Sequence, residues 1–212
     1  MTDLTQTMAR RALDRSVAAR QGAYVDEMQR IVDTTYRLIE RSGELEPSLR
    51  DILRATRLST QAFYRYFNSK DELFLLLLDD GRRQLLNYLD HRMRKAPTAA
   101  GRVKAWIEGV LAQATRAEAA SRTRPFFANE DRLAERFPDE HRGSVDLLVD
   151  QLAGAVRDLD PRRKTKAQAR RDAETIYELT FGTLHRHLLR RTTPTAAETE
   201  HLVRFVLRGA GT

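Results

Sequence analysis

Residues 59–73 read STQAFYRYFNSKDEL, and this stretch decides the fold of the 212-residue chain. Ser59 is of a residue type that caps helix N-termini, and Ala62, Phe63 and Phe67 recur at the spacing of one helix face. The outward and marginal positions are Thr60, Gln61, Tyr64, Arg65 and Tyr66. The stretch therefore predicts a short amphipathic helix with a buried aromatic face and a polar outer face.

A second short helix is predicted just before this one. Ser48 reads as its N-cap and Asp51, three residues on, as the capping-box partner. The connection 55–58 is tight, so the helix at 48–54 and the helix that follows Ser59 indicate a helix-turn-helix. Gln reads adenine edges, Arg grips guanine or phosphate, and Thr and Tyr hydroxyls reach bases or phosphates. The outward residues therefore suit DNA.

The gapless segment 31–73 resembles the N-terminal DNA-binding domain of the tetracycline-repressor (TetR) family of bacterial transcriptional regulators. Its most specific part is S-x-x-x-F-Y-R-Y-F-x-S-K-D-E-L, from Ser59 to Leu73. The resemblance implies an all-α chain with a three-helix DNA-binding domain and N-terminal arm over 1–70. A larger helical domain for effector binding and dimerisation is implied over 71–212, with the last two helices forming a homodimer.

Roles at the DNA follow from the same resemblance. It implies contacts with base edges from Arg50, Thr60, Gln61 and Tyr64. It implies phosphate contacts from Ser48, Ala62, Tyr66 and Lys70, and Arg65 completes the set expected at the DNA. Helix N-termini attract anions, which gives Lys70 a physical reason to meet a phosphate.

Three positions depart from the family pattern. Arg57 stands in the turn where the family has Gly, and a non-Gly residue at positive φ costs about 1 kcal/mol, which leaves a different turn open. Leu53 is larger than the usual Ala, so it could alter how the two helices pack. Gln61 replaces a small residue. The operator sequence therefore cannot be copied from relatives.

The chain on both sides of this motif reads as helix. Met28, Ile31, Val32, Thr35, Leu38 and Ile39 form one stripe that ends at 42–43, and residues 1–22 are a basic segment ahead of it. That segment is either an arm for a minor groove or a solvated helical or disordered extension. After residue 70 the pattern predicts five or six helices, with prolines near their starts or in the connections: Pro97, Pro125, Pro138, Pro161 and Pro194. A last stripe is expected from Leu202, Phe205, Val206 and Gly209.

Aromatic residues of the second domain are candidates for an effector pocket, although each alone is equally at home in a helical core. Thr180 and His185 could orient a ligand by hydrogen bonds. The candidate set is Trp106, Phe126, Phe127, Phe137, Tyr177, Thr180, Phe181 and His185. Together they favour an apolar or aromatic effector.

The composition excludes several classes of function but does not identify one. The net charge of +7 fits a polyanion as partner. The absence of cysteine fits a reducing cytoplasm and excludes thiolate chemistry. The charge is spread evenly: residues 1–70 hold 12 Lys+Arg and 9 Asp+Glu, and 162–164 reads as a solvated basic loop. We expect no metal site, no cofactor and no catalysis, because no His-x-x-x-His pair, phosphate-binding loop or nucleophile elbow occurs. No apolar run is long enough to span a membrane.

These observations predict a cytoplasmic, dimeric regulator, most simply a repressor. It would bind a palindromic operator in double-stranded DNA and leave it when a small molecule occupies the second domain. Two alternatives stay open. One is a helical enzyme or lipid carrier with a basic surface, and the other is a DNA-binding regulator controlled by a protein partner.

Overall fold

The computed structural model describes residues 2–42, 47–160 and 165–210, with side chains from residue 21 on except at 118 and 122. Every regular element in these ranges is a helix, which confirms the expected all-α fold. Within the same ranges, no helix is both long and apolar enough to cross a membrane.

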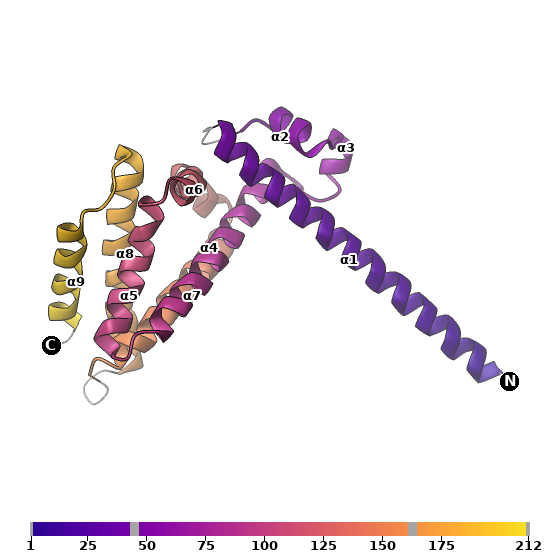
Figure 1. The fold of residues 1–212 in the computed structure, drawn as a ribbon. Coiled ribbons are helices and arrows are strands. Elements are labelled where there is room, and N and C mark those ends of the chain that lie inside the picture. The colour runs from indigo at the N-terminus through magenta and orange to yellow at the C-terminus, as the bar shows by residue number, and fades with distance from the viewer. Residues whose placement is uncertain (1, 43–46, 161–164, 211–212) are drawn as a thin grey trace.

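Three helices form the N-terminal part: α1 (Thr2–Ser42), α2 (Leu49–Thr56) and α3 (Thr60–Phe63). The remainder is α4 (Lys70–Arg94), α5 (Ala99–Leu111), the single 3-10 turn η1 (Ala112–Ala114), α6 (Ala117–Arg136), α7 (Pro138–Arg157), α8 (Lys166–Arg190) and α9 (Ala196–Ala210). This agrees with the five or six helices expected after residue 70. Figure 1 shows α4 leading from the small N-terminal helices into the larger bundle, with α9 at its far end.

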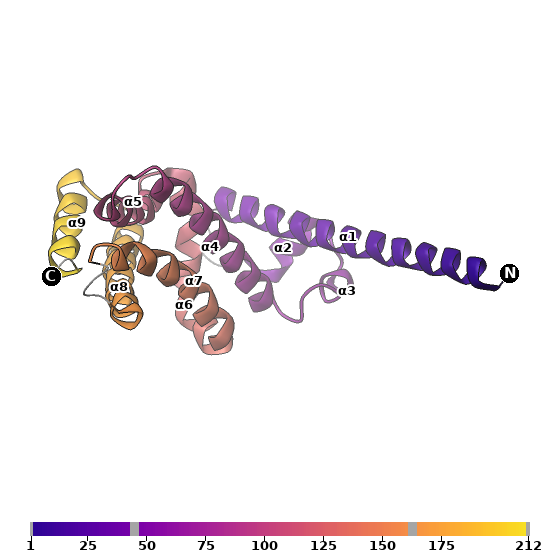
Figure 2. The same cartoon turned by 90° about the horizontal axis from the view of Figure 1, so that it is seen from below.

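α1 is far longer than the amphipathic segment predicted from its apolar stripe. Its N-terminal half projects away from all the other helices in both views (Figures 1 and 2). From Thr2 on, the basic segment 1–22 therefore has a helical backbone that is continuous with α1. The arginines up to residue 20, on which the minor-groove hypothesis rests, have side chains outside the described residues.

Two hydrophobic clusters hold the fold. The first cluster lies among α1 to α4 and includes Ile52, Phe63 and Phe67, and α6 adds Phe126 and Leu133 to it. Because α6 contributes to this cluster, the small N-terminal helices pack directly on the larger part of the chain. Burying apolar side chains of this size stabilises a fold by about 1.5–3 kcal/mol each.

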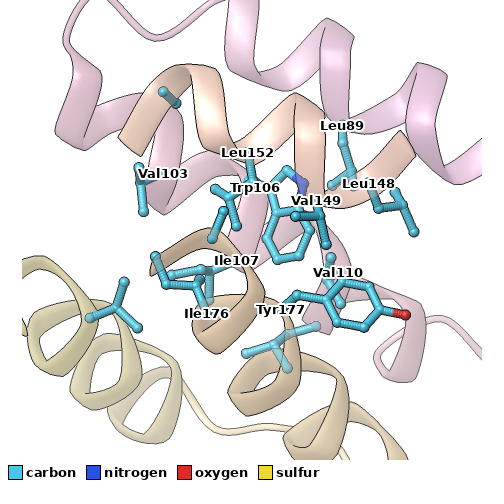
Figure 3. Packing of buried hydrophobic residues seen from close by; sticks show 14 of the residues in the cluster. Leu89, Val103, Trp106, Ile107, Val110, Leu148, Val149, Leu152, Ile176 and Tyr177 are labelled. Carbon is cyan, nitrogen blue, oxygen red and sulfur yellow. The ribbon is translucent and has the colours of Figure 1, made fainter. Parts of the chain in front are cut away.

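The second cluster is centred on Trp106, which is fully buried. Figure 3 shows Trp106 close to Leu152, Val149 and Ile107, from α7 and α5. A close helix approach supports this core: a Cβ added at Gly109 in α5 would lie 2.5 Å from the Leu89 side chain of α4. Any other residue at position 109 would therefore force the Leu89 side chain to shift.

Two expectations about the second part were wrong. Pro125 lies inside α6, where Pro costs about 3 kcal/mol, and not at a helix start. Its buried neighbours belong to a face that packs on the rest of the chain, and that packing outweighs the penalty. In α9 the buried stripe is Val203, Val206 and Ala210, whereas Phe205 is 61% exposed. Among the described residues of one chain, the face of α9 with Val203 and Val206 is buried and the face with Phe205 is exposed. The basic run 162–164 lies outside the described residues.

Candidate nucleic-acid interface and effector cavity

Ser48 caps α2 as expected. The Ser48 hydroxyl accepts a hydrogen bond from the backbone N–H of Asp51 at 3.2 Å and donates one to the Asp51 carboxylate. The carboxylate therefore contacts the hydroxyl, which differs from the backbone bond of a full capping box. α2 then continues to Thr56, two residues further than predicted, and the buried Thr56 hydroxyl donates a hydrogen bond to the Ile52 carbonyl at 2.8 Å.

The turn between α2 and α3 is left-handed at Arg57, with φ 59° and ψ 31°. The Leu53 carbonyl accepts hydrogen bonds from the backbone N–H groups of Arg57 and Leu58, which closes the helix. The chain therefore does not adopt the alternative turn that the replacement of Gly by Arg57 allowed. Arg57 instead takes the conformation that Gly adopts freely, at a cost of about 1 kcal/mol.

α3 is a single helical turn, shorter than the helix expected up to Phe67. Ser59 caps it, since its hydroxyl accepts from the Ala62 N–H at 3.1 Å. The chain then continues as a tight turn in which the Phe63 carbonyl accepts hydrogen bonds from the backbone N–H groups of Tyr66 and Phe67. Phe63 and Phe67 are buried as predicted, and they anchor this short element to the first cluster.

The residues expected at the DNA fall into two groups by exposure. Those that are exposed are Ser48, Arg50, Thr60, Gln61, Tyr64 and Arg65. Those that are half-buried are Ala62, Tyr66 and Lys70. The ammonium group of Lys70, the first residue of α4, lies 5.8 Å from the centre of the Phe74 ring.

Tyr66 differs from its neighbours because it packs against α1. Its ring lies 5.0 Å from the ring of Tyr24, centre to centre, and Tyr24 itself is 44% exposed. Sequence reasoning did not single out Tyr24. An aromatic residue in an otherwise polar part of α1 was the available signal.

The start of α4 is tied to α6. Asp71 is buried, and its carboxylate pairs with the guanidinium groups of Arg136 at 2.7 Å and Arg132 at 3.4 Å. Asp71 directly follows Lys70, so this ion pair connects the region expected at the phosphates to the far end of α6.

A cavity of about 340 Å³ lies among α1, α4, η1, α6 and α8. Its lining is Tyr36, Leu78, Gly81, Arg82, Gln84, Leu85, Tyr88, Ala112, Gln113, Arg116, Ala119, Thr123, Phe126, Phe127, Glu130, Phe181 and Leu184. Three of the expected effector residues, Phe126, Phe127 and Phe181, are in this wall. A size of a few hundred Å³ and a mostly apolar wall are typical of small-molecule sites.

Two other expected effector residues contact rings of the wall without lining the cavity. Tyr177 stacks on Phe181 at 4.2 Å, and burial raises the pKa of the Tyr177 phenol well above its usual range. His185 stacks on Phe127 at 4.9 Å. These two residues therefore support aromatic rings of the wall from behind.

The remaining three expected residues are placed in packed regions. Trp106 belongs to the second cluster, and Thr180 is fully buried with its hydroxyl bonded to the Ile176 carbonyl at 2.7 Å. Phe137 packs against the first cluster. Among the described residues, no group of His, Asp and Glu side chains could hold a metal ion.

Sequence reasoning missed the polar part of the wall. Arg82 in α4 is only 8% exposed and pairs with Glu130 of α6 at 3.1 Å. The same guanidinium donates to the Ser144 hydroxyl and lies 3.1 Å from His141 Nε2, both in α7. Burial opposes ionisation of Glu130, but its bond to His141 and the Arg82 charge lower the pKa below the usual value. Arg82 thus joins three helices beside the cavity.

Comparison with known proteins agrees with the capped motif. Residues 31–77 match the family model of the bacterial regulatory proteins of the tetR family. The chain therefore carries the N-terminal domain of that family, which confirms the resemblance drawn from Ser59 to Leu73. No curated protein sequence matches the chain.

Solved structures extend the similarity of fold to most of the chain. A putative transcriptional regulator from Pseudomonas aeruginosa PAO1 is 18% identical with a TM-score of 0.66, over 87% of this chain and 89% of the other. Reduced NemR of E. coli gives 16% and 0.63, over 86% and 96%. The fatty acid degradation regulator FadR from Bacillus halodurans gives 15% and 0.63, over 86% and 95%. At these identities the likeness concerns the fold.

Proposed function

We propose that this chain is a ligand-responsive transcriptional repressor that binds a palindromic operator as a homodimer. A small apolar or aromatic effector, bound in the cavity, releases it. In this proposal residues 1–70 read DNA and residues 71–212 bind the effector and dimerise. The observation that carries it is the helix-turn-helix with both short helices capped, at residues that match a regulator family.

DNA recognition is assigned to the exposed polar residues of α2 and α3. Arg50, Gln61 and Tyr64 are exposed while Phe63 beneath them is fully buried, so the motif holds its polar side chains outward on a rigid base. Arg and Gln at such positions read guanine and adenine edges in the major groove. Lys70 and the N-terminus of α4 are assigned to a phosphate.

Dimerisation is assigned to α8 and α9. Large apolar side chains on these two helices are exposed in the single chain: Leu179 is 39%, Leu189 68% and Phe205 61% exposed. Exposed apolar side chains gathered on neighbouring elements mark interaction surfaces. A symmetric dimer also supplies the two recognition elements that a palindromic site requires.

Release is assigned to a shift of α4. This helix contributes Gly81, Arg82 and Leu85 to the cavity, and its first turn carries Lys70 and Asp71. A ligand that favours a different position of α4 would change the spacing of the two recognition elements of the dimer. The cavity also supports a small-molecule effector over control by a protein partner.

A gel-shift assay with the DNA beside the coding region tests the proposal. We expect a sequence-selective shift at moderate salt that is lost in Tyr64→Ala and kept in Leu147→Ala, since Leu147 is an equally exposed residue of α7. Absence of any sequence-selective shift would contradict the proposal. An enzyme or lipid carrier would instead be indifferent to changes at Tyr64 and Gln61.

A further inference from the structure

The described residues of the cavity wall carry more positive than negative charge. Arg82 and Arg116 line it as cations, and Glu130 is the acidic residue among the described lining residues. An excess positive charge beside apolar surface attracts anions more strongly than it would in water, because the local dielectric is lower. The cavity thus favours a ligand with a negative charge.

Arg82 is not the group that would meet this charge. It is almost fully buried, and its guanidinium already contacts Glu130, Ser144 and His141. An incoming anion would have to displace Glu130 and leave that carboxylate without its partner. Breaking a buried ion pair in this way is strongly unfavourable. Arg82 and Glu130 therefore act as a fixed part of the wall.

Arg116 differs from Arg82 on each of these points. It is exposed, it lines the cavity and it directly precedes α6, so its side chain belongs to the wall and is also accessible to solvent. Its side chain does not cap α6, and no ion pair of its guanidinium occurs within the described part of the chain. A ligand anion at Arg116 therefore displaces no ion-pair partner among the residues that the structure describes.

The apolar part of the wall is less exposed than Arg116. Phe126 is buried, and the rings of Phe127 and Phe181 are tilted by 35° with centres 6.2 Å apart. Leu85 and Leu184 add aliphatic surface from α4 and α8. A flat or narrow apolar body fits such a wall, while a polar group at its other end would remain near water beside the exposed Arg116.

We propose that the effector is an amphipathic organic anion, with an aromatic or aliphatic body among Phe126, Phe127 and Phe181. Its single carboxylate pairs with Arg116. The regulatory meaning of this ligand rests on the proposed function, but its binding does not. The charge and the apolar body are both required, because Arg116, which has no ion pair among the described residues, and the aromatic rings line one cavity.

Isothermal titration calorimetry on the full chain tests this with two probes, 2-naphthoate and its uncharged amide, 2-naphthamide. The wild type should bind naphthoate about three- to tenfold more tightly than naphthamide at low salt, with a smaller ratio at high salt. Arg116→Gln should bring the ratio close to one by weakening naphthoate alone. Arg171→Gln, the same change at an exposed position of α8 outside the cavity wall, should leave the ratio unchanged.

Equal affinity for the two probes, no measurable binding of naphthoate, or an unchanged ratio in Arg116→Gln would overturn the inference. Operator binding by the ligand-free wild type is measured separately. Loss of sequence-selective DNA binding with the naphthoate preference intact would reject the regulator and keep the anion site. The reverse result would reject the anion site and keep the regulator.

Discussion

The phenol of Tyr36 in α1 donates a hydrogen bond to the backbone carbonyl of Leu77 in α4. Gly81 follows one turn later, and a Cβ there would lie 3.2 Å from the Tyr36 hydroxyl, so the glycine leaves room for the phenol. Tyr36 and Gly81 both line the cavity. A molecule in the cavity therefore contacts α1 and α4 at the place where they are joined.

Removal of this hydroxyl should weaken the junction. Tyr36→Phe should lower the free energy of unfolding by about 0.5–1.5 kcal/mol, because the phenol is buried and its hydrogen bond is lost. Urea denaturation measures the change. Tyr64→Phe, at an exposed phenol, should lie within about 0.5 kcal/mol of the wild type. Equal stability of Tyr36→Phe and wild type would show that the bond contributes nothing.

Arg57 should be a site where glycine stabilises the fold. Arg57→Gly relieves the left-handed strain of about 1 kcal/mol at φ 59°, and after the entropy cost of glycine the net gain should be at most about 0.5 kcal/mol. Arg54→Gly in the last turn of α2 should have the opposite sign, a loss of about 1 kcal/mol. Thermal unfolding of the two variants measures both, and a loss of stability in Arg57→Gly would contradict the strain argument.

Arg50 should set part of the operator sequence. If its guanidinium is bidentate to a guanine, Arg50→Ala costs about 1–3 kcal/mol on the cognate site and relaxes preference at that base. Titrations on cognate and scrambled DNA measure this, with Arg54→Ala as the exposed control in the same helix. A loss that is uniform across sequences, with a salt slope lower by about one, would assign Arg50 to a phosphate instead.

The exposed apolar residues of α8 and α9 should hold the dimer together. Phe205→Glu places a charge on that surface and should shift the protein towards monomer in analytical ultracentrifugation, with weaker operator binding. Leu147→Glu, at a 49% exposed residue of α7, should leave the oligomeric state unchanged. A Phe205→Glu variant that sediments like the wild type would exclude this surface as the interface.

Glu130 should make stability depend on acid pH. Its pKa is below 4.5 in the folded protein, so its ionised form stabilises the fold above pH 4.5. That contribution is lost as the pH falls through the folded-state pKa. Glu130→Gln should therefore cost about 1–3 kcal/mol at neutral pH and progressively less below pH 4.5. Denaturation curves at several pH values measure the difference, and a difference independent of pH would contradict the stabilisation of the ionised carboxylate by His141 and Arg82.

The helix-turn-helix was the part of the molecule most open to prediction from sequence. Ser48 and Ser59 cap their own helices by accepting a hydrogen bond from the backbone N–H three residues later. The burial of Phe63 and Phe67 follows from their helical spacing in the sequence. These interactions join residues a few positions apart, so they can be read locally. The lengths of α2 and α3 could not, because Thr56 and the turn after Phe63 depend on packing in the first cluster.

The cavity could be predicted only in part from the sequence. Aromatic residues could be named as candidates, yet Phe127 and Phe181 line the wall while Tyr177 and His185 lie behind it. Which ring lines the cavity depends on how α6 and α8 pack against each other, and the periodicity of apolar residues does not predict this packing. The exposed side of α9 was equally hidden, because a stripe that includes Phe205 looks the same whether it meets its own chain or another.

The sequence by itself determined the class of the N-terminal domain, the all-α fold and the start signals of most helices, because caps and apolar spacing act over one or two turns. Tertiary structure alone decided that Pro125 is held inside α6, that Arg82 joins α4 to α6 and α7, and that Arg116 lines a cavity. These features combine residues from 36 to 184, and only the burial of helix faces brings such distant positions together.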